Sequence, residues 1–181
     1  MSENEKDKRL YKVIREGNYT NFSGLYGFFF RNCDTLPLSS NKKTMVAFMK
    51  AVDTILKRKD FILIYPEQSM WWNYTKPKPL KIGAYKFAAR NNVPIIPIFI
   101  TMKDSDIVGD DGFPVQEYYI NIEAPIYPTD GMAEKENAEE MKEKNSEVWK
   151  EVYEDFYGIP LEYTTTPKAQ QEQITEQETQ I

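Results

Sequence analysis

Residues 61–100 read FILIYPEQSMWWNYTKPKPLKIGAYKFAARNNVPIIPIFI, and the pattern of this stretch decides the fold class. A continuous run of β-branched and aromatic residues, 61–65, stops at Pro66 and predicts a buried strand. Residues 80–90 carry apolar side chains at helical spacing, and residues 94–100 form a second short apolar run. Two buried strands joined by a helix form a βαβ unit with parallel strands and a right-handed crossover. The stretch therefore predicts an α/β fold.

Polar side chains follow the first of these strands, at the point where it ends. Glu67 and Ser69 come directly after it, and three lysines lie before or at the start of the helix: Lys76, Lys78 and Lys81. In open α/β sheets, ligands bind beyond the carboxyl ends of the strands. A carboxylate binds hydroxyl groups, while lysines and helix N-termini bind phosphate, so this loop fits a polyol phosphate. The alternative is that Glu67 caps the loop and the lysines are solvated.

Three motifs in this stretch resemble those of the glycerolipid acyltransferases, the lysophosphatidate acyltransferase-like family. Residues 65–69, YPEQS, resemble the family's Phe-Pro-Glu-Gly-Thr-Arg block, and residues 81–84, KIGA, resemble the helix that follows it. Residues 93–98, VPIIPI, resemble the block Val-Pro-Ile-hydrophobic-Pro-hydrophobic. The resemblance covers residues 25–126. It implies a three-layer fold with a mixed, mostly parallel sheet flanked by helices, like that of the glycerol-3-phosphate acyltransferases, incomplete at its N-terminus.

The resemblance also implies a reaction, the transfer of a fatty acyl group from a thioester donor to a hydroxyl group in phospholipid biosynthesis. It implies that Glu67 orients the hydroxyl groups of a glycerol-phosphate or lysophospholipid acceptor and that Ser69 replaces the family's threonine. The implied donor is acyl-CoA or acyl-carrier protein, with no cofactor, and the implied setting is a membrane surface. Trp71 and Trp72 then anchor the loop or contact an apolar part of a substrate.

Two arginines that the family uses for phosphate have no clear counterpart here. Gln68-Ser69-Met70 stand where the family has Gly-Thr-Arg. A second family block, Gly-x-x-Phe-Ile-x-Arg, places its arginine near Ser39 and Ser40, or at Arg31 if the alignment is shifted. Lysines near the loop are candidate replacements, although a lysine is a point charge and not a bidentate fork.

Residues 41–59 form the clearest predicted helix, capped by Ser40 or Asn41. Lys42 and Lys43 put positive charge at the positive end of its dipole, which costs a few tenths to ~1 kcal/mol each. Cations in this position suggest an anionic ligand, so both lysines are candidate phosphate-binding residues. The alternative is that they are two exposed lysines on a surface helix.

The sequence contains no histidine and a single cysteine, Cys33. Ser-His-Asp and Cys-His catalysis and histidine metal sites are therefore excluded for these residues, and we predict no metal site. Cys33 is predicted to be a small core residue. The family's base is the histidine of a His-x4-Asp block, and residues 8–40 resemble the segment that follows this block. The resemblance thus implies a truncated member with no catalytic residue, either an enzyme whose gene start is placed too far downstream, which we favour, or a degenerate, inactive copy.

Composition limits the remaining classes of function. The chain has 181 residues, 41% of them hydrophobic, and a net charge of −5, which predicts one main domain and no nucleic-acid partner. A lone cysteine fits a reducing compartment. No apolar run is long enough to cross a bilayer. We therefore expect a cytoplasmic protein, with a peripheral position on the inner face of the membrane as the variant that the lipid substrates suggest.

The domain boundaries and the remaining elements follow from local pattern. Residues 1–9 are predicted to be frayed, 10–160 to form the acyltransferase-like α/β domain, and 161–181 to be a disordered polar tail. Residues 22–30 are rich in aromatic side chains and predict either a helix in the core, which we favour, or a surface that meets the membrane. The other predicted elements are a helix at 9–15, strands at 35–38 and 116–122, a polar turn region at 101–114 and a helix at 132–157.

Three functions are consistent with these patterns, in order of preference. The first is an acyltransferase-family domain. The second is a non-catalytic module that binds a lipid phosphate or a partner. The third is an unrelated α/β enzyme that uses Glu67 as its sole general acid or base, which requires a raised pKa.

Overall fold

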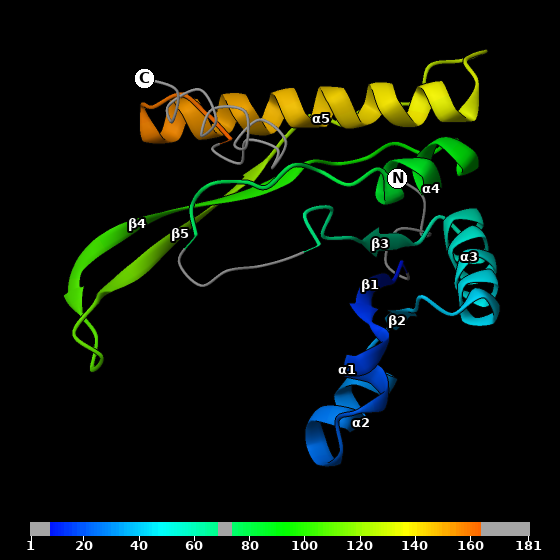
Figure 1. Ribbon diagram of the computed structural model, residues 1–181, viewed down its shortest axis with the longest axis horizontal. Helices are drawn as coiled ribbons and strands as arrows, with labels where there is room; N and C mark the ends of the chain where they lie inside the picture. The colour runs from blue at the N-terminus through cyan, green and yellow to red at the C-terminus, as the bar shows by residue number, and fades with distance from the viewer. Residues whose placement is uncertain (1–7, 69–73, 164–181) are drawn as a thin grey trace, which may run out of the picture.

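A computed structural model describes residues 8–68 and 74–163 of the chain. Figure 1 shows two sheets with helices around them. The elements, in chain order, are β1 (Leu10–Arg15), α1 (Glu16–Thr20), α2 (Gly24–Asn32), β2 (Thr35–Leu38), α3 (Lys42–Lys57), β3 (Phe61–Leu63), α4 (Gly83–Asn91), β4 (Ile98–Val108), β5 (Pro114–Ile122) and α5 (Glu134–Tyr157). The α/β class predicted from the sequence is confirmed.

The first sheet is parallel, and its strands lie in the order β2-β1-β3. Lys12 pairs with Thr35 on one side and with Leu63 on the other, so β1 is the central strand. The prediction of a helix at 9–15 is therefore wrong. Six residues are too few to distinguish a helical from a strand period, and pairing on both sides overrides local propensity.

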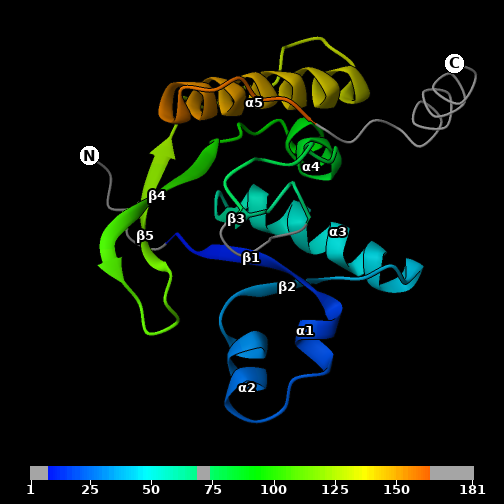
Figure 2. The same ribbon diagram turned by 60° about the vertical axis from the view of Figure 1, so that its left-hand side comes forward.

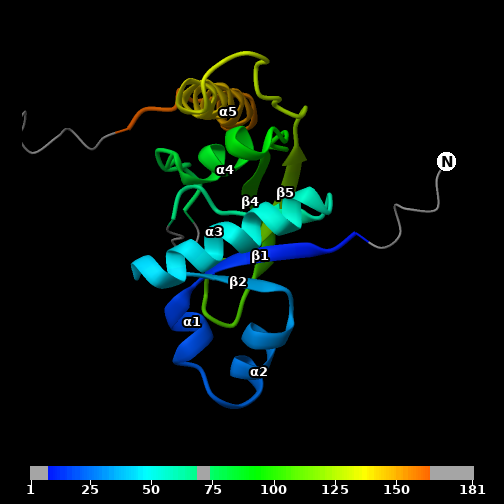
Figure 3. The same cartoon turned by 90° about the vertical axis from the view of Figure 1, so that its right-hand side faces the viewer.

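The connection from β1 to β2 is a pair of short helices, α1 and α2, that projects from the sheet (Figures 1 and 3). Arg31 links them, because its guanidinium donates to the carbonyl oxygens of Tyr19 and Phe22 at 3.3 and 3.2 Å. The prediction that residues 22–30 belong to the core is wrong, since Gly27 is the buried residue of α2 and most of its large side chains are exposed, namely Leu25, Tyr26, Phe28 and Phe29. The helix is correct, but a four-residue strand is too short to cover the apolar side chains of a nine-residue helix.

Helix α3 covers one face of the parallel sheet (Figure 2). Its predicted cap is confirmed, because the side chain of Asn41 accepts a hydrogen bond from the Lys43 N–H at 2.9 Å. Phe48, Val52 and Ile55 on α3 pack with Leu36 of β2 into the first core cluster. Hydrophobic burial at helical spacing thus fixes α3 on the sheet.

The second sheet is an antiparallel hairpin of β4 and β5 in which Ile98 pairs with Ile122. The prediction that residues 94–100 join the 61–65 strand in a parallel βαβ unit is wrong. Pro94 and Pro97 lack the N–H that a central strand must donate, so regular pairing begins only at Ile98. The predicted polar turn at 101–114 is also too long, because β4 continues to Val108; the strand at 116–122 is confirmed as part of β5.

Helices α4 and α5 and the hairpin build the second core cluster. Both helices were predicted, with starts two or three residues earlier than the structure gives them. The cluster consists of Leu80, Tyr85, Ala88, Phe99, Ile126, Ala138, Met141, Trp149 and Tyr153. Phe99 and Trp149 stack with ring centroids 5.2 Å apart, which fixes α5 across the hairpin.

The ends of the domain were predicted to be frayed or disordered, and most of them lie outside the described residues. Arg9, which lies within the described residues, is not frayed, because its backbone N–H donates to the Asp60 carboxylate at 3.1 Å. Leu161 N–H likewise donates to Glu154 at 2.9 Å. Among the helices of the described residues, none has the length and apolar content to cross a membrane.

Candidate functional site at the carboxyl edge of the parallel sheet

Parallel strands end at one edge of a sheet, and this edge gathers the predicted site residues. Figure 3 shows β1 and β2 running the same way, with α3 beginning just beyond the end of β2. β3 is parallel to β1, so the turn that carries Glu67 leaves the sheet at the same edge. The first turn of α3, with Lys42 and Lys43, also begins here. This edge is where α/β proteins bind ligands.

Three hydrogen bonds, each donated by a backbone N–H, hold the turn that follows β3. Gln68 N–H donates to the Tyr65 carbonyl at 3.2 Å, which closes a β-turn with Pro66 in its second position. Lys81 N–H donates to the Pro66 carbonyl at 2.9 Å. Glu67 Oε2 accepts from the Lys78 N–H at 2.7 Å. The turn is thereby fastened to the segment that leads into α4, and the position of Glu67 is fixed.

Glu67 is half-buried, and its environment acts on its ionisation. Burial raises the pKa of the Glu67 carboxyl, while the Lys78 N–H and the charge of Lys78 lower it, with burial the larger effect. A half-buried carboxylate whose orientation is fixed by a backbone N–H is a hydrogen-bond acceptor suited to hydroxyl groups. This arrangement can bind a polyol, and the carboxyl group holds a proton more readily than that of an exposed glutamate.

The C-terminal segment after α5 lies beside this turn, which the sequence did not indicate. Lys76 Nζ donates to the Glu162 carbonyl at 2.6 Å. The pKa of Tyr163 is raised by burial and then by the negative charge of Glu67 and by Tyr74, which places Tyr163 near the carboxylate. Tyr74 lies under the Lys78 ammonium, 5.9 Å from the ring centroid. Tyr74 and Tyr163 thus join the surroundings of Glu67, and no sequence pattern connected residues so far apart.

The predicted lysines have different surroundings. Lys76 is used in the contact with Glu162, and Lys78 approaches Glu67 through its backbone and Tyr74 through its side chain. Lys81 is exposed at the entrance to α4, and Lys42 and Lys43 are exposed on α3. Ser69, Trp71 and Trp72 lie outside the described residues. The phosphate-binding role of the lysines stays a prediction.

The structure identifies Arg15 as a new candidate for phosphate binding and gives Arg31 a structural role instead. Arg15 is exposed at the carboxyl end of the central strand and directly precedes α1. The sequence did not indicate this position, because residues 9–15 were predicted to be a helix. Arg31, the alternative match to the family's second arginine, donates to backbone carbonyls of Tyr19 and Phe22 within the α1–α2 pair. Arg15 is therefore the guanidinium at the candidate edge, and Arg31 fastens two helices.

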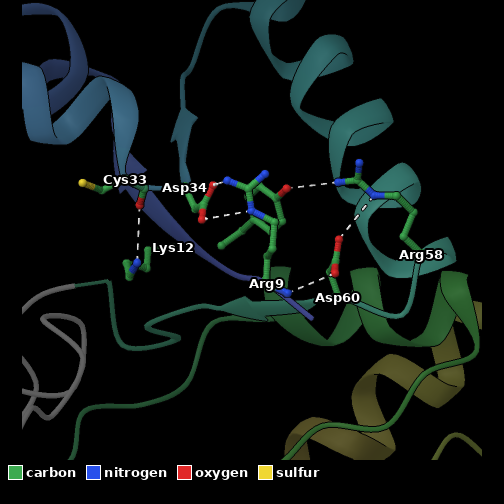
Figure 4. Close-up of polar contacts among 7 residues, drawn as sticks. Arg9, Lys12, Cys33, Asp34, Arg58 and Asp60 are labelled. Atoms are coloured by element: carbon green, nitrogen blue, oxygen red, sulfur yellow. Dashed lines mark hydrogen bonds and ion pairs between the residues drawn. The ribbon is translucent and has the colours of Figure 1, made fainter. Parts of the chain in front are cut away.

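The amino edge of the sheet has a different chemistry, which Figure 4 shows. Arg9 donates to both carboxylate oxygens of Asp34, at 3.3 and 2.6 Å, and Asp60 joins the Arg9 backbone to the Arg58 side chain. These ion pairs connect the start of β1 to the ends of α2 and α3, so they serve structure. Cys33 in this view is exposed, and the prediction that it is a core residue is wrong, because it follows the end of a helix that projects outward.

Comparison with known proteins agrees with this architecture. The acyltransferase family model matches residues 1–101. The crystal structure of the 1-acyl-sn-glycerophosphate (LPA) acyltransferase PlsC from Thermotoga maritima superposes with a TM-score of 0.58 at 19% identity. The match covers 86% of this chain and 58% of that chain, so this chain spans less than two thirds of its structural relative. No curated protein sequence matches the chain. The family match extends over more than half of the sequence and ends just after β4 begins, and the chain therefore belongs to the acyltransferase family.

Proposed function

We propose that this chain carries the acceptor-binding part of an acyl-transfer site in lipid biosynthesis. The acceptor is a glycerol-phosphate-type lipid such as a 1-acylglycerol 3-phosphate, and the donor is an acyl thioester of coenzyme A or acyl-carrier protein. The hydroxyl oxygen attacks the thioester carbonyl, the carbon–sulfur bond breaks, and the thiol leaves with the proton that the hydroxyl loses. The reaction takes place at a membrane surface, on its cytoplasmic side.

The observation that carries the proposal is the position of Glu67. The carboxylate is half-buried at the carboxyl edge of the parallel sheet, and the Lys78 N–H fixes its orientation. A carboxylate in this position accepts hydrogen bonds from acceptor hydroxyl groups and orients one of them for attack. Lys81, Lys42, Lys43 and Arg15 supply positive charge for the phosphate at the same edge.

The proton of the attacking hydroxyl requires a base, and these 181 residues contain no imidazole. Glu67 is assigned to positioning, because its carboxylate is already engaged with the Lys78 N–H. We therefore propose that the 181-residue chain binds the acceptor but does not release thiol from an acyl thioester. The absence of histidine also favours the second candidate, a non-catalytic module that binds a lipid phosphate.

Two measurements on the 181-residue chain test the proposal. The first is equilibrium binding of short-chain 1-acylglycerol 3-phosphate, compared for the wild type, Glu67→Gln and the control Glu147→Gln on the exposed face of α5. We expect the Glu67 variant alone to bind weakly. Equal binding by all three proteins contradicts the assignment of Glu67.

The second measurement is thiol release from acyl-CoA, with and without the frame extended upstream of Met1. If the extension adds a histidine block and release begins, the chain is the acceptor half of an enzyme. If the 181 residues bind acceptor and the extended frame stays inactive, the non-catalytic candidate is correct.

A further inference from the structure

The α1–α2 pair exposes an aromatic surface that the proposed site does not use. Leu25 is 68% exposed and Tyr26 71%, and Phe22, Phe28 and Phe29 are also exposed. We call these five side chains the aromatic face. They lie on a nine-residue helix and the residue pair just before it, so the apolar area is contiguous along the chain. Exposed apolar groups gathered in this way mark a binding surface.

The aromatic face is rigidly presented. Arg31 joins the end of α1 to the start of α2 through the carbonyl oxygens of Tyr19 and Phe22. The rings of Phe22 and Phe30 meet edge to face at 5.3 Å, and Phe28 and Phe29 meet at 6.0 Å. A pair of short helices tied by a side chain, with its rings in mutual contact, holds a surface in place at little further entropic cost on binding.

Charge distinguishes this surface from the rest of the molecule. Residues 12–32 contain Lys12, Arg15 and Arg31 against a single acid, Glu16, a net charge of +2 in a chain of net charge −5. Lys12 donates from Nζ to the Cys33 carbonyl at 3.4 Å, so its ammonium lies at the base of α2. Helix α5 has nine acids and four lysines, a net charge of −5. Figures 1 and 2 show α5 and the α1–α2 pair at opposite ends of the molecule.

We propose that the aromatic face of α2 inserts into the interface of a bilayer that contains anionic phospholipid. Tyr and Phe side chains prefer the boundary between headgroups and acyl chains, and the basic residues at the base of the pair attract anionic headgroups. The acidic helix α5 is repelled and points away, so the molecule has one orientation on the membrane. The inference rests on the proposed lipid substrate for its purpose, but its test does not depend on acyl transfer.

The orientation has a consequence for the candidate site. The α1–α2 pair leaves the sheet from the carboxyl end of β1, directly after Arg15. Helix α1 therefore begins at the edge where Glu67 and the first turn of α3 lie, whereas α2, which carries the aromatic face, ends at the opposite, amino edge. A bilayer on the aromatic face is thus connected to the candidate edge through α1.

A second apolar surface provides a matched control. The tip of the β4–β5 hairpin carries Ile107, Val108 and Phe113, which are 67%, 65% and 67% exposed. Four aspartates in this region, Asp104, Asp106, Asp110 and Asp111, surround it with negative charge. This tip also exposes large apolar side chains, but its negative charge disfavours an anionic surface.

The experiment is flotation of the full 181-residue chain with vesicles of phosphatidylcholine alone or with about 30% phosphatidylglycerol. Three proteins are compared: the wild type, a Leu25→Ser/Tyr26→Ser/Phe28→Ser triple variant, and an Ile107→Ser/Val108→Ser/Phe113→Ser control. We expect the wild type and the control to float with the anionic vesicles, and the α2 variant to bind about tenfold more weakly or worse. Circular dichroism and the thermal midpoint establish that each variant is folded.

Several results would overturn the proposal. One is equal flotation of the wild type and the folded α2 variant, and another is equal loss in the hairpin control. Flotation that is unaffected by phosphatidylglycerol contradicts the role of charge. If the wild type instead self-associates in solution and only the α2 variant is monomeric, the aromatic face binds a second copy of the chain. Failure of acceptor binding with intact flotation would reject the proposed function and leave this inference standing.

Discussion

Glu67 combines partial burial with a hydrogen bond from the backbone N–H of Lys78, and this combination determines what its substitution should do. Its pKa is raised in the folded state, so the folded chain holds the Glu67 proton more tightly than the unfolded chain. The stabilisation is therefore complete below the unfolded pKa and is lost as the pH rises through the folded value. Above the folded pKa, the ionised Glu67 carboxylate is therefore an unfavourable contribution to the free energy of folding.

We therefore predict that Glu67→Gln leaves the free energy of unfolding at pH 7 unchanged or slightly higher, because an amide oxygen can still accept the Lys78 N–H. Acceptor binding should weaken by about tenfold or more, as for the loss of a hydrogen bond to a charged group. Urea denaturation and acceptor titration measure the two effects. A variant that loses stability and binding together would show that Glu67 is structural.

Gly27 is the second residue with a sharp prediction. A Cβ at this position would lie 2.1 Å from the Phe22 carbonyl oxygen and 2.7 Å from an Arg31 guanidinium nitrogen. Gly27→Ala should therefore separate α1 from α2 and destabilise the chain by about 1–3 kcal/mol. Gly83→Ala is the control, because no atom lies within 4 Å of its added Cβ and the helix gains from alanine, by about 0.4–1 kcal/mol. Equal effects of the two substitutions on urea denaturation would contradict the packing described for the pair.

At the scale of elements, the contact between α4 and α5 includes a buried polar pair within the second core cluster. Asn145 Nδ2 donates to the Tyr85 hydroxyl at 2.6 Å, and burial raises the pKa of Tyr85 to about 12. Because the folded pKa lies above the unfolded value of about 10, the chain should lose stability as the pH rises from about 10 to about 12. Tyr85→Phe removes this loss from the profile of thermal midpoint against pH. It also costs about 1–3 kcal/mol at neutral pH, since it leaves the Asn145 amide without this acceptor. A midpoint that falls equally in both proteins would assign the alkaline loss to other groups.

Sequence pattern located the elements better than their pairing. The helices near 42–57, 83–91 and 134–157 were predictable because their apolar side chains recur at helical spacing over several turns. The short segment 10–15 was not, since its neighbours in the sheet decide its conformation. The position of Glu67 at a strand end followed from the apolar run before it, but its contact with Lys78 and the nearby Tyr163 depend on tertiary packing of distant segments.

The same difference explains the two largest errors. Residues 94–100 have the composition of a buried parallel strand, yet two prolines and the partner β5 place their regular part in a hairpin. Residues 22–30 have the composition of a core helix, yet no neighbouring element among the described residues is broad enough to cover them. The composition of a segment shows how apolar it is. It does not show which element the segment packs against, because that depends on the whole fold.

At the scale of the whole molecule, two core clusters meet at a narrow junction between α3 and α4. Phe87 of α4 packs against Phe48 of α3 with centroids 5.6 Å apart, and Asp53 accepts from Arg90 and Asn91 at 3.0 and 3.1 Å. Phe87→Ala should cost about 3–5 kcal/mol and separate unfolding into two steps, with the parallel sheet and α3 melting first. Hydrogen exchange measures this directly, and Phe113→Ala at the exposed hairpin tip is the control. A single cooperative transition in Phe87→Ala would show that the clusters are coupled through other contacts.

The hydrogen bond from Lys76 to the Glu162 carbonyl joins the residues just after α5 to the segment beside Glu67. A molecule that binds residues 161–163 would therefore change the position of the Glu67 carboxylate, which lies nearly a hundred residues earlier in the sequence. Breaking this hydrogen bond would release the segment from Lys76 to Lys78 before any strand separates. The Lys78 N–H that orients the Glu67 carboxylate would be released with it.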